Sequence, residues 1–63
     1  MEKLILIKVK EKNSEDIPVN WFIWERHEFY NDITPDVYTD IMDEIVENYN
    51  RTYTEFYFDW YVV

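Results

Sequence analysis

The chain has 63 residues, a formal net charge of −8 and an aromatic content of 21%. Its length allows one domain, residues 1–63, and its aromatic content excludes a disordered acidic tail, because disordered chains are poor in aromatic residues. The charge argues against direct binding to nucleic acid or to anionic membranes, since both need clustered lysine and arginine. It favours a basic surface on a partner protein instead.

Cysteine and glycine are both absent from the sequence, so it offers no thiolate ligand, no disulfide and no glycine-rich loop to hold a phosphate group. We therefore expect no cofactor and no metal. Only four apolar residues separate Lys3 from Lys8, which is too few for a signal peptide or a membrane span. The expected location is the cytoplasm.

Residues 3–12 are predicted to form the first strand. Residues 4–7 are all leucine or isoleucine, so both faces of this strand are apolar, which is typical of a central strand. Residues 13–18 form a polar connection that ends at Pro18, a residue that cannot donate a hydrogen bond to a sheet.

Residues 19–26 are predicted as the second strand, because they are rich in β-branched and aromatic residues, although periodicity alone leaves a helix open. Residues 27–33 are then expected to form a loop. The two faces of this strand would carry Trp21 with Ile23, and Phe22 with Trp24.

Residues 34–50 have the pattern of an amphipathic helix. Thr34 is a suitable N-cap, since its hydroxyl can accept a hydrogen bond from the first turn, and Pro35 suits the first helical position. Asn50 is a candidate left-handed C-cap. At ~100° per residue the apolar residues share one half of the helix. The residues expected to pack on the third strand are Tyr38, Ile41, Ile45 and Tyr49.

The other half of this helix is uniformly acidic. Its residues are Asp36, Asp40, Asp43, Glu44 and Glu47, with no lysine or arginine among them. Like charges four residues apart destabilise a helix, whereas an ordinary solvated helix mixes signs. Two interpretations remain open. Either the acids keep the protein soluble, or they imitate a row of phosphates, since they recur every ~5–6 Å along the helix.

Residues 52–62 alternate cleanly and are predicted as the third strand. One face would carry Thr54, Phe56, Phe58, Trp60 and Val62. The other face would carry Tyr53, Glu55, Tyr57, Asp59 and Tyr61. The predicted order is therefore β-β-α-β, an α+β fold. Its three-stranded antiparallel sheet has the order second, first, third strand, with one helix packed on one face.

The sheet face that the helix leaves uncovered is expected to expose these tyrosines, and large exposed aromatic patches usually mark an interface. Two interpretations stay open here as well. The patch is a core face or a homodimer face, or it contacts a foreign partner, because tyrosine and tryptophan are common at binding hot spots.

Catalysis is not expected. His27 is the only histidine and Ser14 the only serine. The pair His27 and Glu28 begins like the zinc motif H-E-x-x-H, but Asn31 stands at the fifth position, so the motif fails. Paired carboxylates that act as acid and base need a pocket, and a domain of three strands and one helix has little room for one.

The segments KLILIKVK, VNWFIWE, DVYTDIMDEIVE and TEFYFDWYVV follow one another as two strands, an acidic helix and a tyrosine-rich strand. In this order and composition the chain resembles small acidic phage-encoded inhibitors that mimic DNA, of the uracil-DNA glycosylase inhibitor type or the anti-CRISPR type. The resemblance covers the whole chain as an order of elements and carries over no functional residues. It implies an inhibitor in the cytoplasm of the host cell, with a basic nucleic-acid-binding protein as its target.

We therefore predict an acidic inhibitor that forms a homodimer and acts by phosphate mimicry at the nucleic-acid groove of a host or defence enzyme. The alternative is a structural or assembly protein that forms a homo-oligomer through its aromatic sheet face. The residues predicted to contact the partner are Asp36, Asp40, Asp43, Glu44, Glu47, Tyr53, Glu55, Tyr57, Asp59 and Tyr61.

Overall fold

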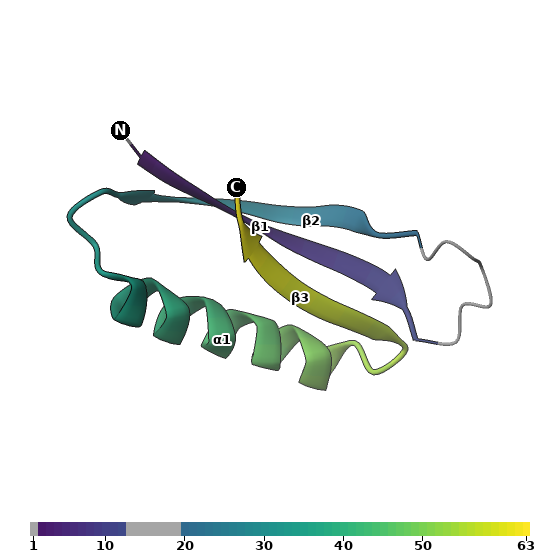
Figure 1. Ribbon diagram of the computed structural model, residues 1–63. Coiled ribbons are helices and arrows are strands. Elements are labelled where there is room, and N and C mark those ends of the chain that lie inside the picture. The colour runs from purple at the N-terminus through teal and green to yellow at the C-terminus, as the bar shows by residue number, and fades with distance from the viewer. Residues whose placement is uncertain (1, 13–19) are drawn as a thin grey trace.

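The computed structural model describes residues 2–12 and 20–63, so the predicted polar connection at residues 13–18 lies outside the described residues. The elements follow in the order β1 (Glu2–Glu11), β2 (Phe22–Tyr30), α1 (Pro35–Thr52) and β3 (Phe56–Val62). The strands form a three-stranded antiparallel sheet in the order β2-β1-β3, and α1 lies along one face of it (Figure 1). The predicted α+β fold and strand order are confirmed.

The central strand β1 divides its side chains between the two sheet faces. Ile5, Ile7 and Val9 lie on the α1 side and are buried, with exposed fractions of 0%, 0% and 7%. Leu4 and Leu6, on the opposite face, are half-buried. Because β1 hydrogen-bonds to a strand on each side, it joins the whole sheet, as its run of leucine and isoleucine predicts.

β2 begins and ends later than predicted. The segment from His27 to Tyr30, expected as a loop, continues the strand and pairs with the first residues of β1. Without this pairing, those residues of the central strand would leave backbone groups unsatisfied on one side, which is costly. His27 and Phe29 are half-buried and face α1, whereas Glu28 and Tyr30 are exposed on the other face.

A β-bulge interrupts the pairing of β1 with β2. Ile7 of β1 pairs with Glu25, but the next residue of β1, Lys8, pairs with Ile23. Trp24 is therefore an extra residue in β2. Such a bulge disrupts the ladder locally and re-aims the side chains next to it.

The bulge places Trp24 and Glu25 on the same side of the sheet, although they are neighbours in the chain. The Trp24 ring meets the Phe58 ring edge-on, with centroids 5.4 Å apart, and the Glu25 carboxylate accepts a hydrogen bond from the Tyr49 hydroxyl. Trp21 lies on the opposite face, beneath lysine side chains of β1. The predicted separation of Trp21 from Trp24 is confirmed.

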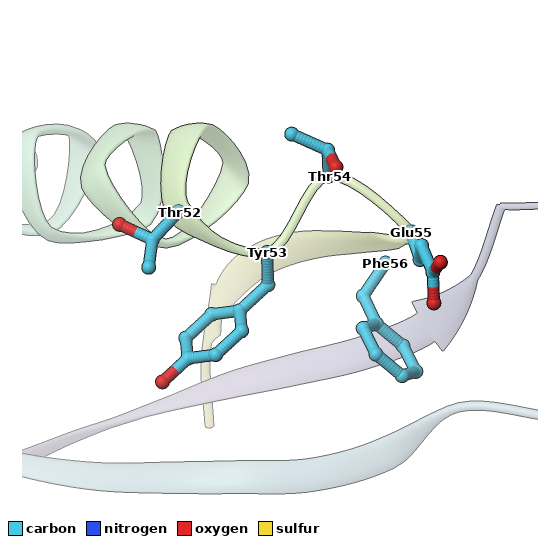
Figure 2. A pocket seen from close by; sticks show the side chains of 5 residues that line it. All are labelled: Thr52, Tyr53, Thr54, Glu55 and Phe56. Carbon is cyan, nitrogen blue, oxygen red and sulfur yellow. The ribbon is translucent and has the colours of Figure 1, made fainter.

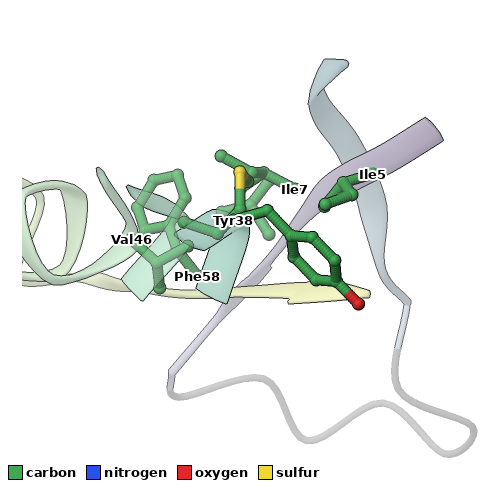
Figure 3. Packing of buried hydrophobic residues seen from close by; sticks show 7 residues of the cluster. Ile5, Ile7, Tyr38, Val46 and Phe58 are labelled. Carbon is green, nitrogen blue, oxygen red and sulfur yellow. The ribbon is translucent and has the colours of Figure 1, made fainter. Parts of the chain in front are cut away.

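The core lies between α1 and the sheet, and its helical part repeats every four residues. Tyr38, Met42 and Val46 are the buried residues of α1. Figure 3 shows Tyr38 and Val46 gathered with Ile5, Ile7 and Phe58 from the sheet. This spacing of four residues keeps the three side chains in one narrow stripe along the helix.

One of the four helix residues expected in the core is misplaced. Tyr38 is buried, and Ile45 and Tyr49 pack against the core while remaining partly exposed. Ile41 is 38% exposed, so its predicted burial is wrong. The stripe that faces the sheet is centred on Met42, which has an exposed fraction of 0%, and this centre turns Ile41 toward solvent.

α1 begins where it was predicted to begin, but the predicted hydrogen bond from the first turn to the Thr34 hydroxyl is not formed. Thr34 is the N-cap, with an extended backbone, and Pro35 is the first helical residue. The Thr34 side chain makes no capping hydrogen bond. Its carbonyl oxygen accepts instead from the backbone N–H groups of Val37 and Tyr38, at 3.1 and 3.2 Å.

The end of α1 differs from the prediction. The helix continues through Asn50 to Thr52, and Tyr53 is the C-cap, with φ −109° and its N–H bonded to the carbonyl of Tyr49. Asn50 is therefore not a left-handed cap. Its side-chain amide donates to the carbonyl of Phe58 at 3.1 Å, and its amide oxygen accepts from the N–H of Phe58 at 2.8 Å. Because the helix is longer, β3 begins at Phe56 rather than at residue 52.

We expect Met42→Ala to lower the free energy of unfolding by about 2–5 kcal/mol, because it leaves a cavity in the buried stripe. Ile41→Ala, one position away on the same helix, should cost about 1 kcal/mol or less, because surface positions tolerate truncation. Urea titrations followed by circular dichroism measure both. Equal losses for the two variants would contradict the placement of the core.

Candidate functional site

The acidic face of α1, defined as Asp36, Asp40, Asp43, Glu44 and Glu47, lies on the outer side of the helix. All five residues are exposed. The buried stripe of Tyr38, Met42 and Val46 holds the opposite side of the helix against the sheet, so packing fixes the direction in which the carboxylates point. The structure thus brings these predicted residues together on one surface.

Two members of the acidic face have partners within the described residues. Glu47 accepts from the Arg51 guanidinium at 2.8 Å, one helical turn away. Because α1 extends past residue 50, Arg51 lies in its last turn and supplies a cation to the C-terminal end of this face. Asp43 accepts from the indole N–H of Trp60 at 2.8 Å, which ties α1 to β3.

Asp36, Asp40 and Glu44 remain without a hydrogen-bond or ion-pair partner among residues 2–12 and 20–63. The Glu47–Arg51 pair is 71% exposed at both side chains, and exposed pairs of this kind contribute little to stability. The acids without a partner therefore lie in the N-terminal part of the helix, and the positive end of the helix dipole stabilises Asp36 in the first turn.

The open face of the sheet, on the side away from α1, combines aromatic rings with lysines. The Lys8 ammonium lies 4.2 Å from the centroid of the Trp21 ring and 5.5 Å from that of Tyr61. The Lys10 ammonium lies 4.9 Å from Trp21 and 5.6 Å from Tyr57. Cations over ring faces are attracted by the ring quadrupole. These two lysines are therefore held on the face opposite the acids.

Only part of the predicted aromatic surface lies on this open face. Tyr57, Asp59 and Tyr61 pair across the sheet with even-numbered residues of β1 and do lie there. Tyr53 belongs instead to the α1 side, because it caps the helix and its ring packs near Phe58. Glu55 lies in the turn before β3 and is exposed. The ten predicted contact residues thus belong to separate surfaces.

An apolar hollow of about 310 Å³ lies where the end of α1 meets the sheet. Its lining is Val9, Trp24, Tyr53, Phe56 and Phe58. Figure 2 shows a neighbouring pocket, lined by Thr52, Tyr53, Thr54, Glu55 and Phe56 where the chain passes from α1 into β3. Tyr53 and Phe56 line both this pocket and the apolar hollow. A hollow lined by these apolar and aromatic side chains suits an apolar group better than a polar cofactor.

Sequence reasoning missed the apolar hollow. The predicted third strand carries Phe56 and Phe58 on one face, and the predicted second strand carries Trp24 on a face whose direction the sequence leaves open. Nothing in the sequence indicates that Tyr53 joins them. The position of Tyr53 depends on the length of the helix. Because α1 ends at Thr52 and β3 begins at Phe56, Tyr53 is not part of the alternating strand.

Glu25 is the centre of a small polar group beside the hollow. One of its carboxylate oxygens accepts from the Tyr49 hydroxyl, and the other lies 3.1 Å from Nε2 of His27. The hydrogen bond to Glu25, together with burial, raises the pKa of Tyr49 above the usual 10.0. The hydrogen bond between Tyr49 and Glu25 joins β2 to α1. The Glu25 carboxylate and the Tyr49 hydroxyl bond to each other rather than facing an open pocket.

The described residues hold no group of three or more histidine, aspartate or glutamate side chains that could bind a metal ion. Within the same part of the chain, no helix has both the length and the apolar character that crossing a membrane requires.

Tyr49→Phe should lower the free energy of unfolding at neutral pH. It should also reduce the further decrease of this free energy as the pH rises into the alkaline range. A raised pKa means that the folded state favours the protonated hydroxyl. The stabilisation is complete below the unfolded pKa of about 10 and is lost as pH rises through the higher folded pKa. Urea midpoints from pH 7 to 11 measure this effect.

Glu25→Gln provides the matched control, because it removes the carboxylate whose hydrogen bond is the largest cause of the raised pKa of Tyr49. It should flatten the alkaline loss as Tyr49→Phe does, and the double variant should show no further change. An alkaline loss as steep in Tyr49→Phe as in the parent would contradict the assigned hydrogen bond.

The chain matches no family model, no curated protein and no solved structure. Its function is therefore inferred from the acidic face, the open face and the apolar hollow.

Proposed function

We propose that this protein binds a basic nucleic-acid-binding protein through the acidic face of α1 and occupies the groove that nucleic acid would otherwise fill. The observation that carries the proposal is the row formed by Asp36, Asp40 and Glu44. These carboxylates are exposed, lie on one side of a rigid helix and have no partner among the described residues. The role is binding rather than catalysis, in the cytoplasm of the cell that contains the target.

The spacing of the row supports phosphate mimicry. Residues four apart on a helix are ~6 Å apart along its axis, so Asp36, Asp40 and Glu44 present a negative charge at each turn. A nucleic-acid strand presents its charges at intervals of the same order. Lysine and arginine side chains in a nucleic-acid groove are long enough to adjust to the remaining difference.

The distribution of charge supports one mode of approach. The acids lie on the outer side of α1. Lys8 and Lys10 lie on the open face of the sheet, where both ammonium groups lie over the Trp21 ring. A basic target is attracted more strongly to the α1 side, where the carboxylates gather, than to the open face, where Lys8 and Lys10 lie beside Asp59, so encounter is oriented before contact. This separation serves a protein partner better than an evenly spread charge would.

A second function, assembly into a homodimer, is favoured by a different observation. Large apolar side chains on β2 are strongly exposed: Phe22 by 65%, Ile23 by 58%, Trp24 by 45% and Tyr30 by 72%. Exposed apolar side chains on an edge strand promote pairing with another chain. Assembly through β2 leaves the acidic face free, so the two functions are compatible.

The double variant Asp40→Lys with Glu44→Lys should keep the fold and lose the target. Both residues are exposed, and their replacement removes a like-charge pair four residues apart, so circular dichroism and the melting temperature should match the parent. Affinity for the target, captured from the source cell's lysate and identified by mass spectrometry, should fall by about 100-fold or more. DNA should compete with the parent for that target.

The control is Glu11→Lys with Asp32→Lys, which makes the same change in net charge at exposed positions outside the acidic face. It should retain most of the affinity. A target that binds the Asp40 and Glu44 variant as tightly as the parent, or that DNA does not displace, would end the mimicry proposal.

A further inference from the structure

The outer edge of β3 is closed by the chain itself. Both backbone groups of Phe58 are bonded to the side chain of Asn50, at 2.8 Å for the N–H and 3.1 Å for the carbonyl. An added strand would use these same groups. Asn50 therefore occupies the middle of this edge as a partner strand would.

The remaining N–H groups along most of this edge are also used locally. The N–H of Phe56 donates to the carbonyl of Tyr53 at 3.2 Å. The N–H of Trp60 donates to the side chain of Asp59 at 2.9 Å. With Phe58 between them, three successive outward N–H groups of β3 have partners, so this edge does not favour strand addition.

The outer edge of β2 is different, and the pairing of β1 shows why. The N–H of Lys12 donates to the carbonyl of Glu55 at 3.1 Å, and the N–H of Val63 donates to the carbonyl of Leu4 at 3.0 Å. Even-numbered residues of β1 thus bond to β3. In an antiparallel sheet the bonding direction alternates, so the odd-numbered residues of β1 bond to β2.

This alternation identifies the outward groups of β2. His27 and Glu25 pair with the odd-numbered residues Ile5 and Ile7 of β1, so their backbone groups point inward. Arg26 and Glu28 therefore point their N–H and carbonyl groups away from the sheet. Their side chains form an exposed ion pair at 3.1 Å, and within the described residues no turn or loop bonds to the backbone groups of either residue.

We propose that β2 pairs antiparallel with β2 of a second copy of this chain, centred on His27, to form a continuous six-stranded sheet. In this register Arg26 of each copy lies opposite Glu28 of the other, and roughly four backbone hydrogen bonds join these residues. The side chains then form a cluster of alternating charge across the two-fold axis. This inference rests on the assembly function proposed above and names its interface.

Charge complementarity selects this register and a second copy as the occupant. Shifting the two-fold axis by one residue would place Arg26 opposite Arg26 or Glu28 opposite Glu28. Like charges directly opposite each other destabilise a sheet, whereas opposite charges stabilise it. An edge that complements itself in one two-fold register has the property that an isologous dimer requires.

The acidic face does not oppose this dimer. Strand pairing within one sheet keeps the two faces of each copy aligned, so both α1 helices lie on the same side. In each copy the inner side of α1 packs on the sheet and reaches β2 through Tyr38 and Tyr49, whereas the acids lie on the outer side of the helix. The carboxylates therefore stay away from the joining edge, and both acidic faces stay exposed.

The test uses the full chain and two charge-reversed variants, Arg26→Glu and Glu28→Arg, in sedimentation equilibrium at about 0.15 M salt. The parent should have the mass of two chains. Each variant alone places like charges opposite each other twice, so its dimer should be weaker by about tenfold or more. An equimolar mixture of the two variants should regain dimerisation, because each then faces its opposite charge.

A cysteine variant tests the register directly, because the chain has no cysteine of its own. Residue 27 faces its counterpart across the axis at ~4.5 Å between Cα atoms, within the range for a disulfide. His27→Cys should therefore form a covalent dimer on mild oxidation. Tyr30→Cys, on the same strand and 72% exposed, is the control, because its counterpart would be ~20 Å away.

The outcomes separate the two proposals. A parent with the mass of one chain at high micromolar concentration would overturn both the dimer and its interface, and leave the edge of β2 for a foreign strand. A dimer that the charge reversals do not weaken, or that crosslinks as well through Tyr30→Cys as through His27→Cys, would overturn this interface while the assembly function stands.

Discussion

The contact between Asn50 and Phe58 is the interaction on which the arrangement of the helix and β3 depends. It fixes the last turn of α1 against the strand that follows only a few residues later, so the intervening turn has little freedom. The position of Tyr53 in the apolar hollow follows from it, because the helix must continue beyond Asn50 before the chain reverses. The side-chain amide of Asn50 bonds to Phe58 as the backbone of a neighbouring strand would. The same residue therefore ends the sheet at this edge and holds the helix against it.

The bulge at Trp24 has a comparable effect on the opposite edge. One extra residue turns Trp24 toward the rings at the end of α1 and sets Glu25 where it bonds to Tyr49. Without the bulge, strict alternation would place one of these two neighbours on the open face. The link between β2 and α1 therefore depends on an irregularity, while the link between β3 and α1 depends on the Asn50 side chain and on packing around Phe58 in a regular strand.

The sequence predicted the order of the elements, the central position of β1 and the exposed acids, because each depends on a local pattern: an apolar run, an alternation, or a helical period. It did not predict the length of β2, since pairing with β1 outweighs the polar residues around His27. Nor did it place Tyr53 or Arg51, because the end of α1 is set by the distant partner that Asn50 finds in Phe58. Local patterns carry no information about such a contact.

The hydrogen bond from Trp60 to Asp43 has a consequence for the thermodynamics of recognition. The indole N–H gives this carboxylate a fixed partner on β3, so part of the entropic cost of ordering Asp43 is met during folding. Asp36, Asp40 and Glu44 have no such partner among the described residues and keep the freedom of their side-chain torsions. The acidic face thus combines one carboxylate that is already oriented with three whose side chains can still adjust.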